Sequence, residues 1–238
     1  QSRGIPVGNT PGILDGATAD MAFTLLLATA RRLVESDRYA RSAAFTRYDP
    51  GLILGREVHS QTIGIVGMGR IGRKIAQRAR GFDMTVQYHN RRRDLEAEST
   101  LGAQYRSLDD LLATSDYVVL SVPLTADTRG LIGREQLRRM KPTAILVNVA
   151  RGPIVDTAAI TEALQERWIY AAGLDVTDPE PLPDSHPLWS MPNCIITPHV
   201  AVTPDMAQPL LLERITANVR RFAGGEELLG LIDPDSGY

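Results

Sequence analysis

Short apolar runs alternate with amphipathic stretches through most of the chain. The apolar runs are TIGIV, MTVQY, YVVLSV, AILVNV, YAAGLDV and CIIT, all between residues 62 and 197. Among them lie RIGRKIAQRAR, SLDDLLATS, REQLRRM and TAAITEALQER, whose apolar residues recur at helical spacing. Runs that are apolar on both faces and alternate with helices are typical of a parallel sheet covered on both sides. The pattern therefore predicts an α/β fold, a doubly wound parallel sheet of the Rossmann type.

Two further helices are predicted outside the alternation. From Asp15 to about Ala44 there is no proline and no glycine after Gly16, which favours one long helix. Its middle is apolar almost all round and offers more apolar surface than one domain covers, so we expect a symmetric homodimer. A last helix is predicted from Asp205, ending at Gly224 and Gly225.

Composition narrows the classes of partner. The chain has 238 residues with 26 basic and 28 acidic side chains, so no global field attracts nucleic acid or a membrane surface. The longest apolar run, MAFTLLLATA, is too short to span a bilayer. The only cysteine, Cys194, excludes an internal disulfide and fits a reducing compartment, while the four histidines lack paired spacing for a metal site. We expect a cytoplasmic protein that binds neither metal, nucleic acid nor membrane.

The stretch GMGRIG, residues 67–72, joins a predicted strand to a predicted helix. In a dinucleotide site Gly67 closes the strand, Gly69 lets the backbone approach a pyrophosphate, and Gly72 permits close packing of helix and strand. The N–H groups of Arg70 and Ile71 then face the pyrophosphate at the positive end of the helix. We therefore predict that this whole loop, Met68 included, binds a dinucleotide; three glycines in an ordinary turn are the alternative.

The end of the second strand bears on which nucleotide binds. NAD sites usually carry an acidic residue there, but this chain reads His89-Asn90-Arg91-Arg92-Arg93. An acid repels a 2′-phosphate, whereas guanidinium groups pair with it. We predict NADP(H) as the cofactor, bound by Asn90, Arg91 and Arg92, with NAD(H) as the weaker alternative. A solvated basic turn is the competing interpretation.

Three polar stretches follow later strands: VNVARGPIVD, GLDVTDPEP and TPHV. With GMGRIG and VPLTADTRGLI, their order resembles the D-isomer-specific 2-hydroxyacid dehydrogenase family, in particular its NADP-dependent glyoxylate and hydroxypyruvate reductases. The resemblance covers nearly the whole chain. It implies an oxidoreductase that moves a hydride between NADP(H) and a small 2-oxo or 2-hydroxy acid, with glyoxylate or hydroxypyruvate as the expected substrate.

The resemblance also implies roles for individual residues. Arg151 would anchor the substrate carboxylate, His199 would act as general acid, and Glu180 would hold the other imidazole nitrogen. Taken singly, an arginine after a strand is usually a surface ion pair, an acid in a proline-rich loop is usually solvated, and a histidine is usually structural. The implied cofactor contacts are Val122, Pro123 and Thr128 near the adenosine, and Val149, Ala150, Arg151, Asp175, His199 and Ala201 near the nicotinamide.

The same resemblance divides the chain. Residues 1–14 would be the exit segment of a flavodoxin-like substrate domain, residues 15–202 the dinucleotide-binding domain, and residues 203–238 a C-terminal helix and tail that pack toward the substrate domain. Family members carry more of that domain in front of this point, where it closes over the substrate. If this chain were the complete molecule, we would expect cofactor binding with poor or no turnover; a longer parent would be an active reductase.

Two other functions fit part of the pattern. A formate-type dehydrogenase of the same fold carries glutamine beside the histidine, and Glu180 argues against it. A nucleotide-sensing corepressor retains the same three residues but should keep an acid after the second strand. The Asn90–Arg91 pair counts against this second alternative.

Overall fold

A seven-stranded sheet forms the centre of the computed structural model, which describes residues 5–202 and 204–232. The strands are β1 (Thr62–Val66), β2 (Thr85–His89), β3 (Gln104–Tyr105), β4 (Tyr117–Leu120), β5 (Ile145–Asn148), β6 (Ala171–Leu174) and β7 (Cys194–Ile196). They are all parallel, in the order β3-β2-β1-β4-β5-β6-β7. This confirms the predicted doubly wound α/β sheet. The predicted segments at residues 1–4, 203 and 233–238 lie outside the described residues.

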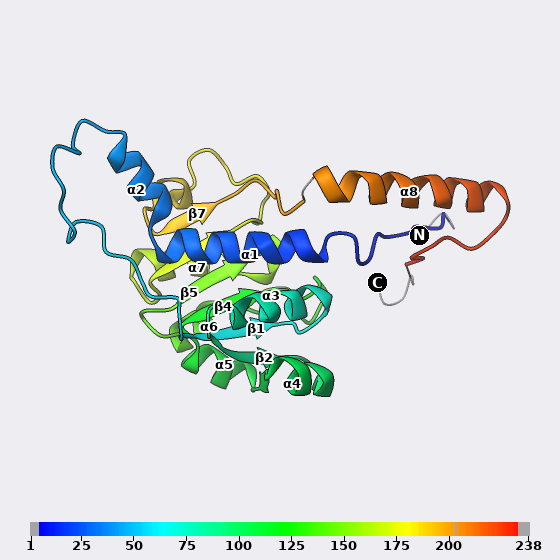
Figure 1. The fold of residues 1–238 in the computed structure, drawn as a ribbon, viewed down its shortest axis with the longest axis horizontal. Helices are drawn as coiled ribbons and strands as arrows, with labels where there is room; N and C mark the ends of the chain where they lie inside the picture. Colours follow the sequence, from blue (N-terminus) through cyan, green and yellow to red (C-terminus); the bar gives the residue numbers. More distant parts are fainter. Residues whose placement is uncertain (1–4, 203, 233–238) are drawn as a thin grey trace.

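Helices cover both faces of the sheet (Figure 1). One core layer lies under α1 (Asp15–Ala30), α3 (Arg70–Arg80) and α4 (Leu95–Leu101), and the other under α5 (Leu108–Thr114), α6 (Arg134–Arg139) and α7 (Thr157–Gln165). Successive strand residues face opposite layers, so Val119 packs in the first core and Val118 and Leu120 pack in the second. Two short 3₁₀ helices, Gly152–Ile154 and Pro187–Ser190, follow β5 and precede β7.

The prediction of one helix from Asp15 to Ala44 is wrong. Helix α1 ends at Ala30, and α2 (Leu33–Ala40) begins after Arg32, which has a left-handed backbone with φ of 50°. The Ala30 carbonyl accepts the N–H of Arg56 at 2.7 Å instead of an amide one turn further along the helix. The backbone at Gly55 runs so close that a Cβ there would lie 2.5 Å from the Ala30 oxygen. The break is therefore imposed by a segment distant in sequence.

The reason given for a dimer through this helix also fails. Leu25 and Leu26 in the middle of α1 are buried within the chain itself, against α3 and strands β5 and β6. The apolar side chains that stay exposed lie beyond the break, in a projecting arm that we define as residues 31–56 (Figure 1).

The two ends of the described chain lie together, away from the sheet. Helix α8 (Pro204–Ala223) extends from the body with the N-terminal segment alongside it (Figure 1). Asn9 N–H donates to the Gly230 carbonyl and Ile232 N–H to the Val7 carbonyl, both at 2.8 Å. Helix α8 ends at Ala223, directly before Gly224 and Gly225, where the sequence predicts its end. Its side chains Leu212, Ile215, Val219 and Phe222 are exposed.

The sheet topology gathers the predicted site. Val66 pairs in register with both His89 and Leu120, and Leu174 pairs with both Asn148 and Ile196. The segments that follow these strands therefore leave the sheet at one edge. The order reverses between β1 and β4, and ligands of open α/β sheets bind at such a switch point.

Candidate functional site

The glycine loop is held by the strands on both sides of β1. Gly67 has φ of +104°, donates its N–H to the His89 carbonyl at 2.9 Å, and accepts the Ser121 hydroxyl at 2.6 Å. A Cβ on Gly72 would lie 2.1 Å from the Gly67 oxygen, so α3 starts at a distance from β1 that only glycine permits. These contacts, made within the chain itself, set the conformation of the loop.

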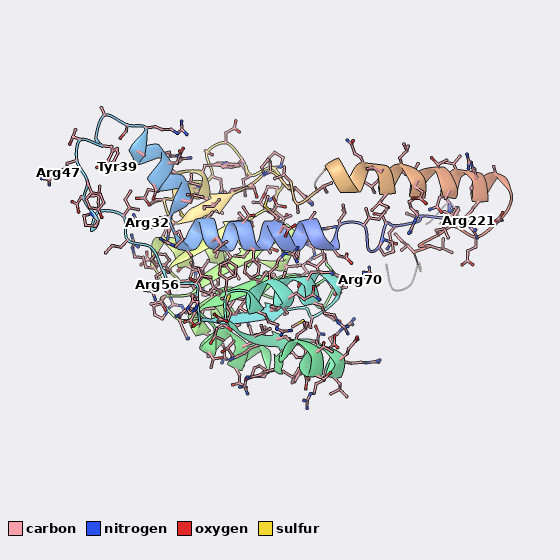
Figure 2. All side chains as sticks on the ribbon, in the orientation of Figure 1. Arg32, Tyr39, Arg47, Arg56, Arg70 and Arg221 are labelled. Atoms are coloured by element: carbon pink, nitrogen blue, oxygen red, sulfur yellow. The ribbon has the colours of Figure 1, made fainter. Side chains whose placement is uncertain are left out.

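The start of α3 presents amide groups for which the described residues offer no acceptor. Gly69 precedes the helix and has no side chain to cap it, and a Cβ built there would meet nothing within 4 Å. The N–H groups of Arg70 and Ile71 lie in the first turn, where no intrahelical acceptor exists. Arg70 lies beside the N-terminal end of α1, with Nε 3.3 Å from an Asp15 oxygen (Figure 2). This end of α3 has the amides, the dipole and the open space that an anion needs.

His199 and Glu180 meet at the other half of the same edge. His199 Nδ1 lies 2.7 Å from Glu180 Oε1, and both side chains are nearly half exposed, at 45% and 40%. A carboxylate only accepts, so Nδ1 carries a proton and Nε2 is the nitrogen left free. The pair is therefore an imidazole oriented through Nδ1, with Nε2 available to another partner.

A buried carboxylate fixes the turn that carries His199. Asp175 is 1% exposed, and its two oxygens accept the Thr197 hydroxyl at 2.6 Å and the N–H groups of Val200 and Ala201 at 3.0 and 3.2 Å. Its own carbonyl accepts the His199 N–H at 2.9 Å. His199 has φ of 56°, a region that L-residues rarely adopt. The family resemblance implies that Asp175 lies near the nicotinamide. In the structure, its carboxylate oxygens accept hydrogen bonds from the turn that carries His199.

Arg151 follows β5 at the same edge but touches neither Glu180 nor His199. Its Nη1 donates to the Ala150 carbonyl at 2.6 Å, and the side chain is exposed. Asn148, 1% exposed, fixes the backbone on either side: its amide donates to the Arg151 carbonyl and its oxygen accepts the Ala150 N–H, both at 3.0 Å. The backbone position of Arg151 is therefore well determined, while most of its guanidinium faces outward.

Comparison with known proteins places this geometry in a family. The family profile described as "D-isomer specific 2-hydroxyacid dehydrogenase, NAD binding domain" matches residues 23–201. The chain belongs to this family. A glyoxylate reductase from Thermococcus kodakarensis is 51% identical to this chain over 228 residues, which are 94% of this chain and 68% of that protein.

Solved structures agree with the family assignment. The TT0316 protein from Thermus thermophilus superposes on this chain with a TM-score of 0.90 and 44% identity, over 98% of this chain and 73% of that one. A glyoxylate reductase from Paecilomyes thermophila gives 0.88 and 34%, over 99% and 70%. The predicted hydride-transferring oxidoreductase of this family is thereby confirmed at the level of reaction class. The glycine cradle, with open space at Gly69 and unpaired amides behind it, fits the dinucleotide that the family's domain binds.

The remaining predicted cofactor residues differ in what they expose. The Met68 side chain is buried, so within the glycine loop only its backbone can contact a ligand. Val149, Ala150 and Ala201 are buried at the ends of their segments, whereas Val122 is half-buried and Pro123 exposed. Thr128 donates its hydroxyl to the Pro123 carbonyl at 2.6 Å and accepts the Thr125 N–H at 2.8 Å. The Thr128 hydroxyl thus joins two other residues of the loop after β4. The contact of Thr128 with adenosine stays a prediction.

The residues of the basic turn after β2 differ in their hydrogen bonds and ion pairs. Asn90 Oδ1 accepts the Met68 N–H at 2.7 Å, which ties the turn to the glycine loop. Arg93 pairs with Glu98, while Arg91 and Arg92 are exposed and have no ionic partner in the described part of the chain. The three arginines are therefore not equivalent, which the sequence did not reveal.

Sequence reasoning missed two residues that build the site. Ser121 donates its hydroxyl to the Gly67 carbonyl, and Asn148 fixes the backbone at Arg151. Each is a polar residue at or just after the end of an apolar strand, and this signal could have found both. The sequence predicts Asp175 as a site residue but does not reveal that it shapes the histidine turn.

The described residues also bear on a metal site, on a membrane span and on the histidines outside the candidate site. The described residues contain no group of three or more His, Cys, Asp or Glu side chains placed to hold a metal ion. Within the same residues, no helix is both long and apolar enough to cross a bilayer. His59 is exposed, with Nε2 3.1 Å from an Asp83 oxygen, and His186 accepts the Leu188 N–H at 3.4 Å in its own loop.

Proposed function

We propose that this dehydrogenase reduces a small 2-oxo acid, glyoxylate or hydroxypyruvate, with NADP(H) as its cofactor. The observation that carries the proposal is the His199–Glu180 pair, 2.7 Å apart, at the sheet edge that also carries the glycine loop. The name of the 51% identical relative, glyoxylate reductase, supports this substrate class. A 2-oxo acid requires a carboxylate anchor, a proton donor and a hydride donor.

Arg151 is the proposed carboxylate anchor. One guanidinium nitrogen donates to the Ala150 carbonyl, and the other N–H groups have no acceptor among the described residues. A planar guanidinium with free donors on one side binds a carboxylate through two parallel hydrogen bonds. Because Asn148 holds the backbone at Arg151, the anchor fixes the distance between the substrate carbonyl and the histidine.

His199 is the proposed proton donor. Glu180 keeps Nδ1 as a hydrogen-bond donor, so the proton exchanged with the substrate oxygen is the one on Nε2. Bound reduced nicotinamide supplies the hydride to the carbonyl carbon. As the carbonyl oxygen takes up electrons, Nε2 gives it a proton, which leaves a hydroxyl on the product and a neutral imidazole; the opposite direction reverses both transfers.

NADP(H) is the proposed cofactor because of the turn after β2. Arg91 and Arg92 offer two guanidinium groups without an ionic partner in the described chain, next to the loop that suits a pyrophosphate. The acids that follow the turn are themselves paired, Asp94 with Arg73 and Glu98 with Arg93. A 2′-phosphate thus meets free positive charge rather than an acid.

Turnover separates this function from the corepressor-like alternative. We expect absorbance of NADPH to fall when glyoxylate or hydroxypyruvate is added, and NADH to bind more weakly than NADPH. Capture of peptide ligands without turnover of either acid would favour the binding-protein alternative. Equal affinity for NADH and NADPH, unchanged in Arg91→Ala, would remove the cofactor assignment.

We propose a homodimer formed through the arm, in the cytoplasm. Supporting the dimer are the side chains of Phe45, Leu52 and Leu54, each about half exposed or more among the described residues. Supporting a reducing compartment is Cys194, a single free thiol whose pKa burial raises to about 12.

A further inference from the structure

The turn between β2 and α4 is fixed at both of its ends. At its start, Asn90 Oδ1 accepts the Met68 N–H from the glycine loop at 2.7 Å. At its end, Asp94 receives Arg73 of α3 through two hydrogen bonds of 2.9 and 2.8 Å and caps α4 by accepting the Ala97 N–H at 3.0 Å. Only the three arginines at positions 91–93 lie between these two anchors. The path of the backbone through the turn is therefore set by its neighbours.

Beneath the turn lies a buried hydroxyl. Tyr88, the last residue but one of β2, is fully buried, with its ring edge-on to that of Tyr105 at 5.5 Å. Its hydroxyl accepts the Asp94 N–H and donates to Glu98 Oε1, each at 2.7 Å. Burial and the neighbouring carboxylate raise the pKa of Tyr88, so the hydroxyl keeps its proton for donation. One core hydroxyl thus joins the end of the turn to the first helix after it.

Glu98 pairs with one of the three arginines of the turn. Arg93 donates to it through Nε at 3.0 Å and Nη2 at 2.5 Å. The hydrogen bonds from Arg93 and Tyr88 hold the pKa of Glu98 at about 2, so it is an anion throughout the physiological range. Arg93 is neutralised, and Arg91 and Arg92 are the guanidinium groups of the turn that keep their charge available.

We infer that Tyr88, acting through Asp94 and Glu98, is the positioning residue that directs Arg91 and Arg92 to the 2′-phosphate of the cofactor. Tyr88 itself touches no ligand: it fixes the end of the turn and, through Glu98, keeps Arg93 out of the phosphate site. The inference rests on the proposed NADP(H) function and goes beyond it, because it places cofactor discrimination in a core hydroxyl. A merely structural hydroxyl would alter stability and leave discrimination unchanged.

The test compares NADPH and NADH, which differ only in the 2′-phosphate. Their dissociation constants are measured from nicotinamide fluorescence for wild type, Tyr88→Phe and Tyr117→Phe. Tyr117 is the matched control, because it is equally buried and its hydroxyl donates to the Glu57 carbonyl at 2.5 Å. It is the first residue of β4 and therefore lies at the amino ends of the strands, away from the glycine loop. We expect the NADPH preference to fall about tenfold in Tyr88→Phe, the size of one charge-assisted contact, and to stay unchanged in Tyr117→Phe.

The outcomes separate this inference from the proposed function. If wild type prefers NADPH and Arg91→Ala weakens the preference, but a folded Tyr88→Phe retains it, the cofactor assignment stands and the inference is overturned. If wild type shows no preference, both fall. Should Tyr88→Phe not fold, Glu98→Gln carries the test, since it keeps the shape but frees Arg93; an unchanged preference there also overturns the inference.

Discussion

At the residue scale, the site depends on a histidine in a backbone conformation that needs support. His199 has positive φ without being glycine, a conformation that costs about 1 kcal/mol or more. Asp175 provides the support, since its oxygens accept two backbone N–H groups and one hydroxyl from the turn. A carboxylate suits this place because it accepts in every direction and donates in none.

Replacing Asp175 by asparagine should separate this role from simple burial. The side-chain amide would face an N–H donor, so we expect a loss of about 1–3 kcal/mol in unfolding free energy and a lower kcat as the histidine turn relaxes. Asp156→Asn is the control: Asp156 only caps α7 through Ala159, and asparagine caps equally well, so a change under about 0.5 kcal/mol is expected. Chemical denaturation and steady-state kinetics measure both. Equal stability and kcat in Asp175→Asn would contradict the support role.

At the element scale, the unit formed by β1, the glycine loop and α3 makes two different demands on its glycines. Gly72 lies where the helix meets the strand, and a Cβ would lie 2.1 Å from the Gly67 oxygen. Gly69 lies at the open start of the helix, has φ of −84°, and a Cβ there meets no protein atom within 4 Å. Packing therefore requires glycine at position 72, whereas at position 69 only the dinucleotide that we propose would require it.

The two alanine variants should therefore behave oppositely. Gly72→Ala forces α3 away from β1, and we expect it to lower the unfolding free energy by about 1–3 kcal/mol or more. Gly69→Ala should fold with an unchanged melting temperature but bind NADPH at least about tenfold more weakly, because its methyl group takes the space of the pyrophosphate. Thermal unfolding and NADPH titration give both readouts. Tight NADPH binding by Gly69→Ala would mean that the loop is an ordinary turn.

At the scale of the whole molecule, apolar side chains stay exposed on two separate projections. The arm exposes Phe45 and Leu54, and α8 exposes Leu212 and Val219 (Figure 1). Figure 2 shows Arg47 and Tyr39 on the arm, far from Arg221 on α8. Our proposal assigns the dimer contact to the arm.

Paired substitutions distinguish the two projections. Light scattering at micromolar concentration should give a dimer mass for wild type and a monomer mass for Phe45→Ser with Leu54→Ser, because the apolar contact is lost. Leu212→Ser with Val219→Ser removes as much exposed apolar surface from α8 and should leave the dimer intact. A monomeric wild type, or dissociation by the α8 pair alone, would contradict the assignment.

Sequence predicted those parts of the molecule that depend on local pattern. The alternation of apolar runs gave six of the seven strands, but β3, with only two residues, is too short for any periodicity to show. The break after Ala30 could not be predicted, because its carbonyl bonds Arg56 from a distant segment. Likewise, Arg91 and Arg93 are the same residue type in one run, and only folding places Glu98 against one of them.

The central claim is that His199, held by Glu180, donates the proton in reduction of a 2-oxo acid, and the most direct test measures binding and turnover on the same samples. NADPH affinity and the rate of NADPH oxidation with glyoxylate are compared for wild type, His199→Gln and Glu180→Gln. We predict turnover in wild type, a loss of roughly 10²–10⁴-fold in His199→Gln, a smaller loss in Glu180→Gln, and similar NADPH affinity in all three. A His199→Gln protein that oxidises NADPH as fast as wild type, or a wild type that binds NADPH but never oxidises it with glyoxylate or hydroxypyruvate, would contradict the account.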